Sequence, residues 1–281
     1  MPGASQLDAI ISLMAQAHGR DLSCFDQAFL RKTLRHRLAS SGSPNAEAYA
    51  QRLAVDPQEA EALWRALGIT YSEFFRETLT FALLEQLVLP GLLQEMAELG
   101  RPELRLWSAA GAAGQEAYSL AILLEELTAG RGQEAAFRIF ATDICPDSLA
   151  QGQEGLYEAQ ALQNVRLRHL NGWFTRQGEA YRVVPRLRER VAFSVHDLLD
   201  QRLASPAASI YGDFDLVMCS NLLFYYRADI RGLILDRVGR SLRAGGYLVT
   251  GQAERAMVEQ DQGLRALAPV TAVFRKADQQ G

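Results

Sequence analysis

A run of small residues that ends in an acid, Ser108–Glu116 (SAAGAAGQE), has the composition of a ligand-binding turn. It follows a strand-like segment that begins at Leu104 and precedes a helical apolar pattern from Ala117. The chain can turn tightly at Gly111, where no side chain keeps a ligand from the backbone. Glu116 stands where a dinucleotide fold places pyrophosphate, and its charge would repel a diphosphate. A ligand with an ammonium or sulfonium group suits this acid, and S-adenosylmethionine carries both; an alanine-rich turn without a ligand is the alternative.

Other polar residues follow the ends of predicted strands. Asp143 follows the predicted strand Phe137–Thr142, and a carboxylate there can accept hydrogen bonds from both ribose hydroxyls of an adenosine. Two further pairs stand in similar places: Asp197-Leu198 after the predicted strand Val191–Val195, and Asn221-Leu222 after the predicted strand Asp213–Cys219. Open α/β sheets bind ligands outside the carboxyl ends of their strands, so we expect these residues at one edge of a sheet.

The segment Gly68–Glu77 (GITYSEFFRE) contains an arginine directly after two aromatic residues. Two adjacent aromatic residues, Phe74-Phe75, would pin the turn into a core and hold Arg76 in a fixed direction. An arginine placed in this way suits recognition of a carboxylate, because its planar fork can bond both oxygens. The alternative is an ordinary ion pair with Glu73 or Glu77.

Positive charge gathers in two other segments. On a predicted helix from Phe25 to Leu38, the basic residues are Arg31, Lys32, Arg35, His36 and Arg37, and no acid lies between Phe29 and Ser40. Residues four apart share a helix face, so this helix carries a positive face that either binds an acidic partner or is merely solvated. The segment from Gln160 to Arg190 has seven arginines against two acids and predicts a hairpin around Gln177-Gly178-Glu179.

The order of these elements predicts two domains. Residues 1–78 show only helical patterns, with capping signals at Asn45 and at Asp56-Pro57. Residues 79–103 read as a linker helix broken at Leu89-Pro90-Gly91. From 104 to 281 strands and helices alternate, which predicts an α/β fold with a mainly parallel sheet and an antiparallel last strand near Val270–Arg275. A polar segment at about 156–190 interrupts this alternation as an insertion.

Composition narrows the class of function. The chain has 281 residues, 48% of them hydrophobic, and a formal net charge of −4, which gives no reason to expect nucleic acid as a partner. Its three cysteines and four histidines lack the spacing of a metal site or a disulfide framework, so we expect no metal. Neither a signal peptide nor a membrane-spanning run is predicted, which favours a cytoplasmic protein without membrane insertion.

Taken together, these motifs resemble one family. ITYSEFFRE, WSAAGAAGQEAYS, FATDI, HDLL, CSNLLFYY and LRAGGYLVTGQAE, with the insertion GLY…WF…YRVV…LRERVAF, occur in the order found in the chemotaxis-receptor glutamate methyltransferases, the CheR family. The similarity runs from about Asp21 to Lys276. It implies a class I S-adenosylmethionine-dependent methyltransferase domain with a Rossmann-like sheet, joined to an N-terminal all-α domain and interrupted by a small β-subdomain.

The resemblance also implies roles for single residues. Arg76 and Tyr225 match the residues nearest the transferred methyl group. The cofactor S-adenosyl-L-methionine, whose product is S-adenosyl-L-homocysteine, would be bound by Thr70, Ser72, Arg76, Gly111, Glu116, Asp143, Asp197, Leu198, Asn221 and Leu222. Family members often have asparagine in place of Thr70, threonine in place of Ser72, and Glu-Glu-Pro in place of Gln115-Glu116-Ala117.

The expected reaction is methylation of glutamate side chains on the cytoplasmic helical bundle of chemoreceptors. A glutamate with an ordinary pKa of about 4.3 is already ionised at neutral pH and needs no general base. Arg31, Lys32, Arg35 and Arg37 are the expected substrate-binding residues. The short turn at Thr175–Ala180 has one glycine, so we expect no tether to a receptor C-terminal peptide. Methyl transfer to another acceptor, and a non-catalytic module that binds the cofactor, remain alternatives.

Overall fold

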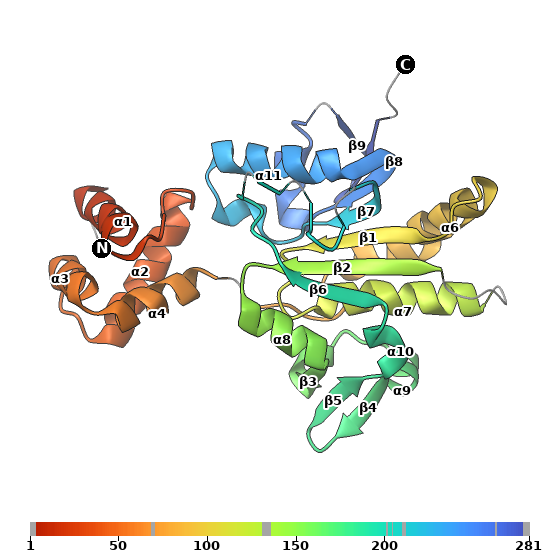
Figure 1. The fold of residues 1–281 in the computed structure, drawn as a ribbon, viewed down its shortest axis with the longest axis horizontal. Helices are drawn as coiled ribbons and strands as arrows, with labels where there is room; N and C mark the ends of the chain where they lie inside the picture. Colours follow the sequence, from red (N-terminus) through yellow and green to blue (C-terminus); the bar gives the residue numbers. More distant parts are fainter. Residues whose placement is uncertain are drawn as a thin grey trace. The chain divides into compact units, whose positions relative to one another are not determined.

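The computed structural model describes residues 4–68, 71–130, 136–200, 202–203, 205–209, 212–261 and 263–277. Its internal contacts divide the chain into two compact units (Figure 1). The helical unit comprises Met1–Ile69 and Leu223–Gly232, and the sheet unit comprises Thr70–Leu222 and Leu233–Gly281.

The helical unit is built from α1 (Ala4–His18), α2 (Gln27–Ser41), α3 (Ala46–Val55) and α4 (Pro57–Leu67). Polar side chains begin three of these helices: Asp26 accepts from Ala28 and Phe29, Asn45 from Ala48, and Asp56 from Gln58 and Glu59. The predicted caps at Asn45 and Asp56 are confirmed. The helices bury a common core that includes Leu7, Ile10, Met14, Leu34, Tyr49, Leu53 and Leu63.

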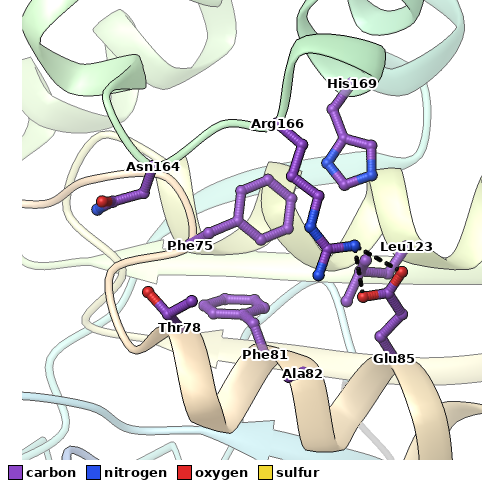
Figure 2. A pocket seen from close by; sticks show the side chains of 9 residues that line it. All are labelled: Phe75, Thr78, Phe81, Ala82, Glu85, Leu123, Asn164, Arg166 and His169. Carbon is purple, nitrogen blue, oxygen red and sulfur yellow. Dashed lines mark hydrogen bonds and ion pairs between the residues drawn. The ribbon is translucent and has the colours of Figure 1, made fainter.

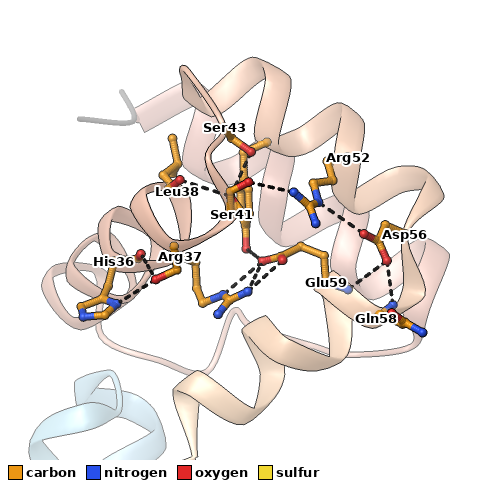
Figure 3. Close-up of polar contacts among 11 residues, drawn as sticks. His36, Arg37, Leu38, Ser41, Ser43, Arg52, Asp56, Gln58 and Glu59 are labelled. Atoms are coloured by element: carbon orange, nitrogen blue, oxygen red, sulfur yellow. Dashed lines mark hydrogen bonds and ion pairs between the residues drawn. The ribbon is translucent and has the colours of Figure 1, made fainter.

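A buried acid joins α2 to α3 and α4 (Figure 3). Glu59 accepts from the guanidinium of Arg37 at 2.7 and 2.8 Å and from the hydroxyl of Tyr49 at 2.8 Å. The Arg37 fork therefore holds the unit together, and we withdraw Arg37 from the predicted substrate-binding face. Sequence could not show this, because Glu59 lies 22 residues away on another helix.

Removing this acid tests its structural role. Glu59→Ala should lower the free energy of unfolding by about 3 kcal/mol, because the partly buried Arg37 loses its partner. Glu61→Ala is the matched control, since Glu61 is 43% exposed and forms ion pairs with Arg20 and Arg65, whose side chains are 42% and 72% exposed. Denaturant unfolding should show a shift of at most about 0.5 kcal/mol for the control. Equal shifts in the two variants would contradict a structural role for the Arg37–Glu59 pair.

A short segment far along the chain completes the helical unit. Tyr225 ends the 3-10 turn η3 (Leu223–Tyr225), and its carbonyl accepts from the backbone N–H of Asp26 at 2.8 Å. The ring of Tyr225 packs edge-on against Phe29 with centroids 4.7 Å apart, and Tyr226 stacks on Phe25 at 5.2 Å. Tyr225 is thus fixed by the segment that leads into α2.

The sheet unit contains a seven-stranded sheet in the order β6-β2-β1-β7-β8-β10-β9 (Figure 1). Its strands are β1 (Leu104–Ala109), β2 (Phe137–Asp143), β6 (Val191–Val195), β7 (Phe214–Met218), β8 (Leu242–Val249), β9 (Leu264–Ala266) and β10 (Val273–Lys276). The first five in spatial order pair in parallel, whereas β10 runs antiparallel to β8 and β9. Helices α7 (Gln115–Ala129), α8 (Pro146–Glu154), η4 (Gln252–Glu254) and α12 (Arg255–Val258) belong to this unit, and α11 (Ala228–Ser241) begins in the helical unit and continues into this one at Leu233. The predicted fold class is confirmed.

The helix before the sheet differs from the prediction. It runs as α5 (Thr78–Leu83), a π-helical turn η1 (Leu84–Val88) and α6 (Leu89–Glu98), so Pro90 does not break it. The N–H of Leu89 bonds to the carbonyl of Leu84, five residues earlier. This wider turn comes directly before Pro90, which sits in the first turn of α6, where its missing N–H costs little.

The inserted subdomain has its own small sheet, in the order β3-β5-β4. It contains β3 (Leu156–Glu158), η2 (Ala159–Leu162), α9 (Leu167–Trp173), β4 (Phe174–Gln177), β5 (Ala180–Val183) and α10 (Pro185–Arg188). The predicted hairpin is β4–β5, whose paired residues Gln177 and Ala180 leave a two-residue turn.

Most arginines of the insertion form ion pairs. Six of the seven have acidic partners, as follows: Arg166 and Arg168 with Glu85, Arg176 with Glu179, Arg182 with Glu154, and Arg186 and Arg190 with Glu125. Glu85 and Glu125 are contributed by η1 and α7, so these pairs fasten the insertion to the rest of the sheet unit. Except for Glu179, these partner acids lie outside the segment from Gln160 to Arg190, so a local count of charges does not reveal them.

Candidate cofactor site at the carboxyl edge of the sheet

Five parallel strands bring their carboxyl ends to one edge of the large sheet. Gly111 follows β1, Asp143 ends β2, and Asn221 comes soon after β7. His196, which follows β6, donates its backbone N–H to the carbonyl of Asp143 at 3.1 Å. The order of strands along the chain reverses direction at β1, and open α/β sheets bind ligands at such a point.

The turn after β1 is fixed by Asp143. Its two carboxylate oxygens each accept one backbone N–H at 2.9 Å, from Ala112 and from Cys145. Burial raises the pKa of Asp143, and these backbone hydrogen bonds oppose the rise. Each oxygen has further lone pairs and can accept another donor, such as a hydroxyl group. A Cβ at Gly111 would lie 2.4 Å from the Ser108 hydroxyl, so any other residue there would force this hydroxyl to move.

Glu116 lies half-buried in the first turn of α7. The hydroxyl of Ser108 donates to its Oε1 at 2.7 Å. Burial raises the pKa of Glu116 to about 7, and the hydrogen bond from Ser108 opposes this rise. The charge of Glu254 raises this pKa further and that of Arg76 lowers it. The site therefore holds a carboxyl group that a cationic ligand would ionise fully.

Asn221 is held by two acids, Glu254 and Glu77, and the sequence predicted neither contact. It has a φ of 59°, and its backbone N–H donates to Glu254 Oε2 at 2.8 Å. The same oxygen accepts from Gly251 N–H at 2.8 Å, and the Asn221 side-chain amide donates to Glu77 at 3.4 Å. The only signal for Glu254 was an acid three residues after Gly251, the spacing of a capping box.

Arg76 follows a turn whose anchors are buried. Phe74 and Phe75 are 0% and 6% exposed, and the N–H of Phe75 donates to the Ser119 hydroxyl on α7 at 3.0 Å. Arg76 itself is exposed. Its guanidinium carbon lies 5.4 Å from the centre of the Tyr71 ring, and its Nη1 donates to the Tyr71 carbonyl at 3.5 Å. Within the described residues it forms no ion pair with Glu73 or Glu77.

The structure places the remaining predicted residues as follows. Asp197 accepts from the N–H of Leu199 at 2.8 Å, Leu198 is buried, and Ser72 and Leu222 are half-buried. Thr70 lies outside the described residues. Tyr225 belongs to the helical unit, as described above.

A sheet of this topology, with acids at its carboxyl edge, defines a class I S-adenosylmethionine-dependent methyltransferase. The chain belongs to the CheR methyltransferase family, because the family model described as "CheR methyltransferase, SAM binding domain" matches residues 70–271.

Two relatives named chemotaxis protein methyltransferase agree with this assignment. The chain is 37% identical over 185 residues to Chemotaxis protein methyltransferase 1 of Pseudomonas aeruginosa, which is 64% of each chain. It is 28% identical over 249 residues to the Chemotaxis protein methyltransferase of Listeria monocytogenes, 89% of each chain. A match of 28% identity to a 104.1 kDa protein of Rhodobacter capsulatus spans 26% of that relative's length. Among solved structures, the DszA carbon methyltransferase matches with a TM-score of 0.43 and 15% identity, over 88% of this chain and 70% of that chain.

The residues present at this edge fit S-adenosylmethionine. Glu116 supplies a negative charge for an ammonium or sulfonium group, and Asp143 supplies acceptors for hydroxyls. Among the described residues there is no group of three or more acids, histidines or cysteines that could hold a metal. No helix in the described part of the chain is long and apolar enough to cross a membrane.

The raised pKa of Glu116 predicts a pH-dependent affinity. Only the carboxylate attracts a cationic ligand, so binding of S-adenosylmethionine should be roughly eightfold weaker at pH 6.0 than at pH 7.5, given a pKa of about 7. Calorimetric titration of the purified protein measures this change. Glu116→Gln should bind weakly at both pH values, and a variant that kept the full pH dependence would show that another group titrates.

The same shift has a consequence for stability of the ligand-free protein. Because the folded-state pKa lies above the ordinary value of 4.5, the protein loses stability as pH rises through about 7. Glu116→Gln should therefore melt at a higher temperature than the parent protein above pH 7. This advantage should vanish as pH falls towards 4.5.

Proposed function

We propose that this protein transfers a methyl group from S-adenosylmethionine to glutamate side chains of chemoreceptors in the cytoplasm, which gives glutamate methyl esters and S-adenosylhomocysteine. The observation that carries the proposal is Arg76, an exposed arginine on a buried aromatic turn in the same unit as Glu116 and Asp143. Two relatives named chemotaxis protein methyltransferase support the substrate class.

The chemistry asks little of the protein beyond binding and orientation. S-adenosylmethionine supplies an electrophilic methyl group on a sulfonium. The substrate glutamate is ionised at neutral pH, so its carboxylate oxygen can attack without a general base. Arg76 would hold that carboxylate through one or both oxygens. Glu116, Asp143, Asp197, Leu198, Asn221 and Leu222 would hold the cofactor, and Tyr225 would stabilise positive charge with its oxygen or ring face.

The direct test uses labelled S-adenosylmethionine with cytoplasmic fragments of chemoreceptors. The proposal expects methyl groups that base releases, since esters hydrolyse in base and methyl amines do not. Label on a small metabolite would favour another acceptor. Cofactor binding without turnover on any acceptor would favour a non-catalytic module.

Substitution of Arg76 separates orientation of the substrate from binding of the cofactor. Arg76→Ala should lower turnover about a hundredfold, because the substrate carboxylate loses a charge-assisted pair. Arg76→Lys should recover little, since an ammonium group lacks the planar fork. Affinity for S-adenosylmethionine, measured by calorimetry, should change far less. Full activity of the Arg76→Lys variant would contradict the proposal that Arg76 orients the substrate carboxylate.

Recognition of the receptor is the second part of the proposal. We assign it to Arg31, Lys32 and Arg35 on α2, a helix without acids between Phe29 and Ser40. The two-residue turn between β4 and β5 offers little loop surface for an added peptide, which supports recognition without a C-terminal tether. The acidic methylation helices of the receptor would then meet α2 directly.

Charge reversal on α2 tests this assignment. Arg31→Glu with Arg35→Glu should abolish receptor methylation and leave cofactor affinity unchanged. The matched control is Arg65→Glu with Arg240→Glu, whose side chains are 72% and 77% exposed. Activity of the parent protein should fall steeply with salt, because such contacts are screened over about 8 Å at physiological ionic strength. Tight binding to an isolated receptor C-terminal peptide would refute recognition without a tether.

A further inference from the structure

The inserted subdomain contacts both residues that come directly before Arg76. The Phe74 ring packs edge-on against Tyr157 and Phe174, with centroids 4.9 and 5.2 Å away. The backbone N–H of Phe74 donates to the carbonyl of Ala161 at 3.2 Å. Phe75 stacks on His169 at 5.3 Å (Figure 2). The insertion therefore fixes both aromatic anchors of the Arg76 turn.

A polar contact reaches further towards the arginine. Glu73 accepts from the side-chain amide of Gln163 at 2.6 Å and from that of Asn164 at 3.2 Å. The hydroxyl of Tyr71 donates to the same carboxylate. Tyr71 in turn lies beneath the guanidinium of Arg76. Side chains of the insertion are thus connected to Arg76 through Glu73 and Tyr71.

The insertion can act as a fixed support because ion pairs fasten it to the sheet unit. Figure 2 shows Arg166 reaching both oxygens of Glu85, at 2.8 and 2.9 Å, beside Phe75 and His169. Arg168 bonds Glu85 at 2.8 Å and lies 3.3 Å from Glu126 on α7. These contacts hold the segment from Asn164 to His169 against η1 and α7.

We propose that the inserted subdomain positions Arg76, and that Gln163 and Asn164 are positioning residues that act through Glu73 and Tyr71. This inference rests on the proposed role of Arg76 in orienting the substrate carboxylate. A long exposed side chain has many rotamers, and a stacked tyrosine restricts them. The turn itself requires support, because Phe75 has a φ of 53°, a strained conformation for a bulky residue.

The test converts the two amide donors into acids that repel Glu73. Gln163→Glu with Asn164→Asp should lower kcat for methyl transfer about tenfold, since hydrogen bonds to a charged group are lost. Affinity for S-adenosylmethionine should stay within about twofold. All three side chains lie at the surface or half-buried, so the thermal midpoint should change little. Gln160→Glu with Asn171→Asp is the matched control, with the same charge change at exposed positions of the insertion.

A rescue distinguishes positioning from a general loss of structure. Adding Glu73→Gln to the double variant gives an amide that donates to the new carboxylates, and activity should return by at least about fivefold. Should the double variant fold poorly, Gln163→Ala with Asn164→Ala removes the donors without adding charge, and its kcat should also fall.

The outcomes are separable from those of the proposed function. Wild-type turnover in the double variant and in the alanine pair, while Arg76→Ala is inactive, would overturn this inference alone. Absence of rescue by Glu73→Gln, with the fold intact, would also overturn it. Wild-type turnover in Arg76→Ala would instead remove the proposed role of Arg76.

Discussion

The site depends on keeping carboxylates out of water at one edge of the sheet. Asp143 and Glu254 are 7% and 0% exposed, and Glu116 is half-buried. Burial of a carboxylate is costly unless hydrogen bonds or opposite charges compensate it. Backbone N–H groups bond to Asp143 and Glu254, and a serine hydroxyl bonds to Glu116. Glu116 has the least compensation, and its raised pKa marks the place where a cationic ligand gains most.

The same acids also hold strained backbone in place. Ala112 and Asn221 both have positive φ, which is uncommon for residues other than glycine. The N–H of Ala112 bonds to Asp143, and that of Asn221 bonds to Glu254. Asp143 thus fixes the turn at Ala112 and would also face the ligand. Glu254 fixes the turn at Asn221, and Asn221 would face the ligand. A change at Asp143 would therefore alter both the shape of the turn after β1 and the hydroxyl acceptors.

Sequence patterns predicted the features that depend on residues close together in the chain. Periodicity and turn residues predicted the parallel sheet, including strands β1, β2 and β6. They also predicted the caps at Asn45 and Asp56 and the hairpin β4–β5. They could not predict pairings between distant segments. The ion pairs Arg37–Glu59 and Arg166–Glu85 are examples. Each arginine has many acids in the chain as possible partners, and only the fold decides which one lies beside it. The π-helical turn before Pro90 was not predicted either, because a proline usually indicates the end of a helix.

These distant pairs change how the insertion is understood. The segment is rich in arginine, yet most of these arginines bind acids of the sheet unit itself. What remains exposed near the Arg76 turn are the amides of Gln163 and Asn164, which bond Glu73. The insertion touches residues 73 to 75 by aromatic, backbone and amide contacts, and it leaves Arg76 open to solvent. The proposed support would allow Arg76 to be exposed to solvent while keeping a defined direction.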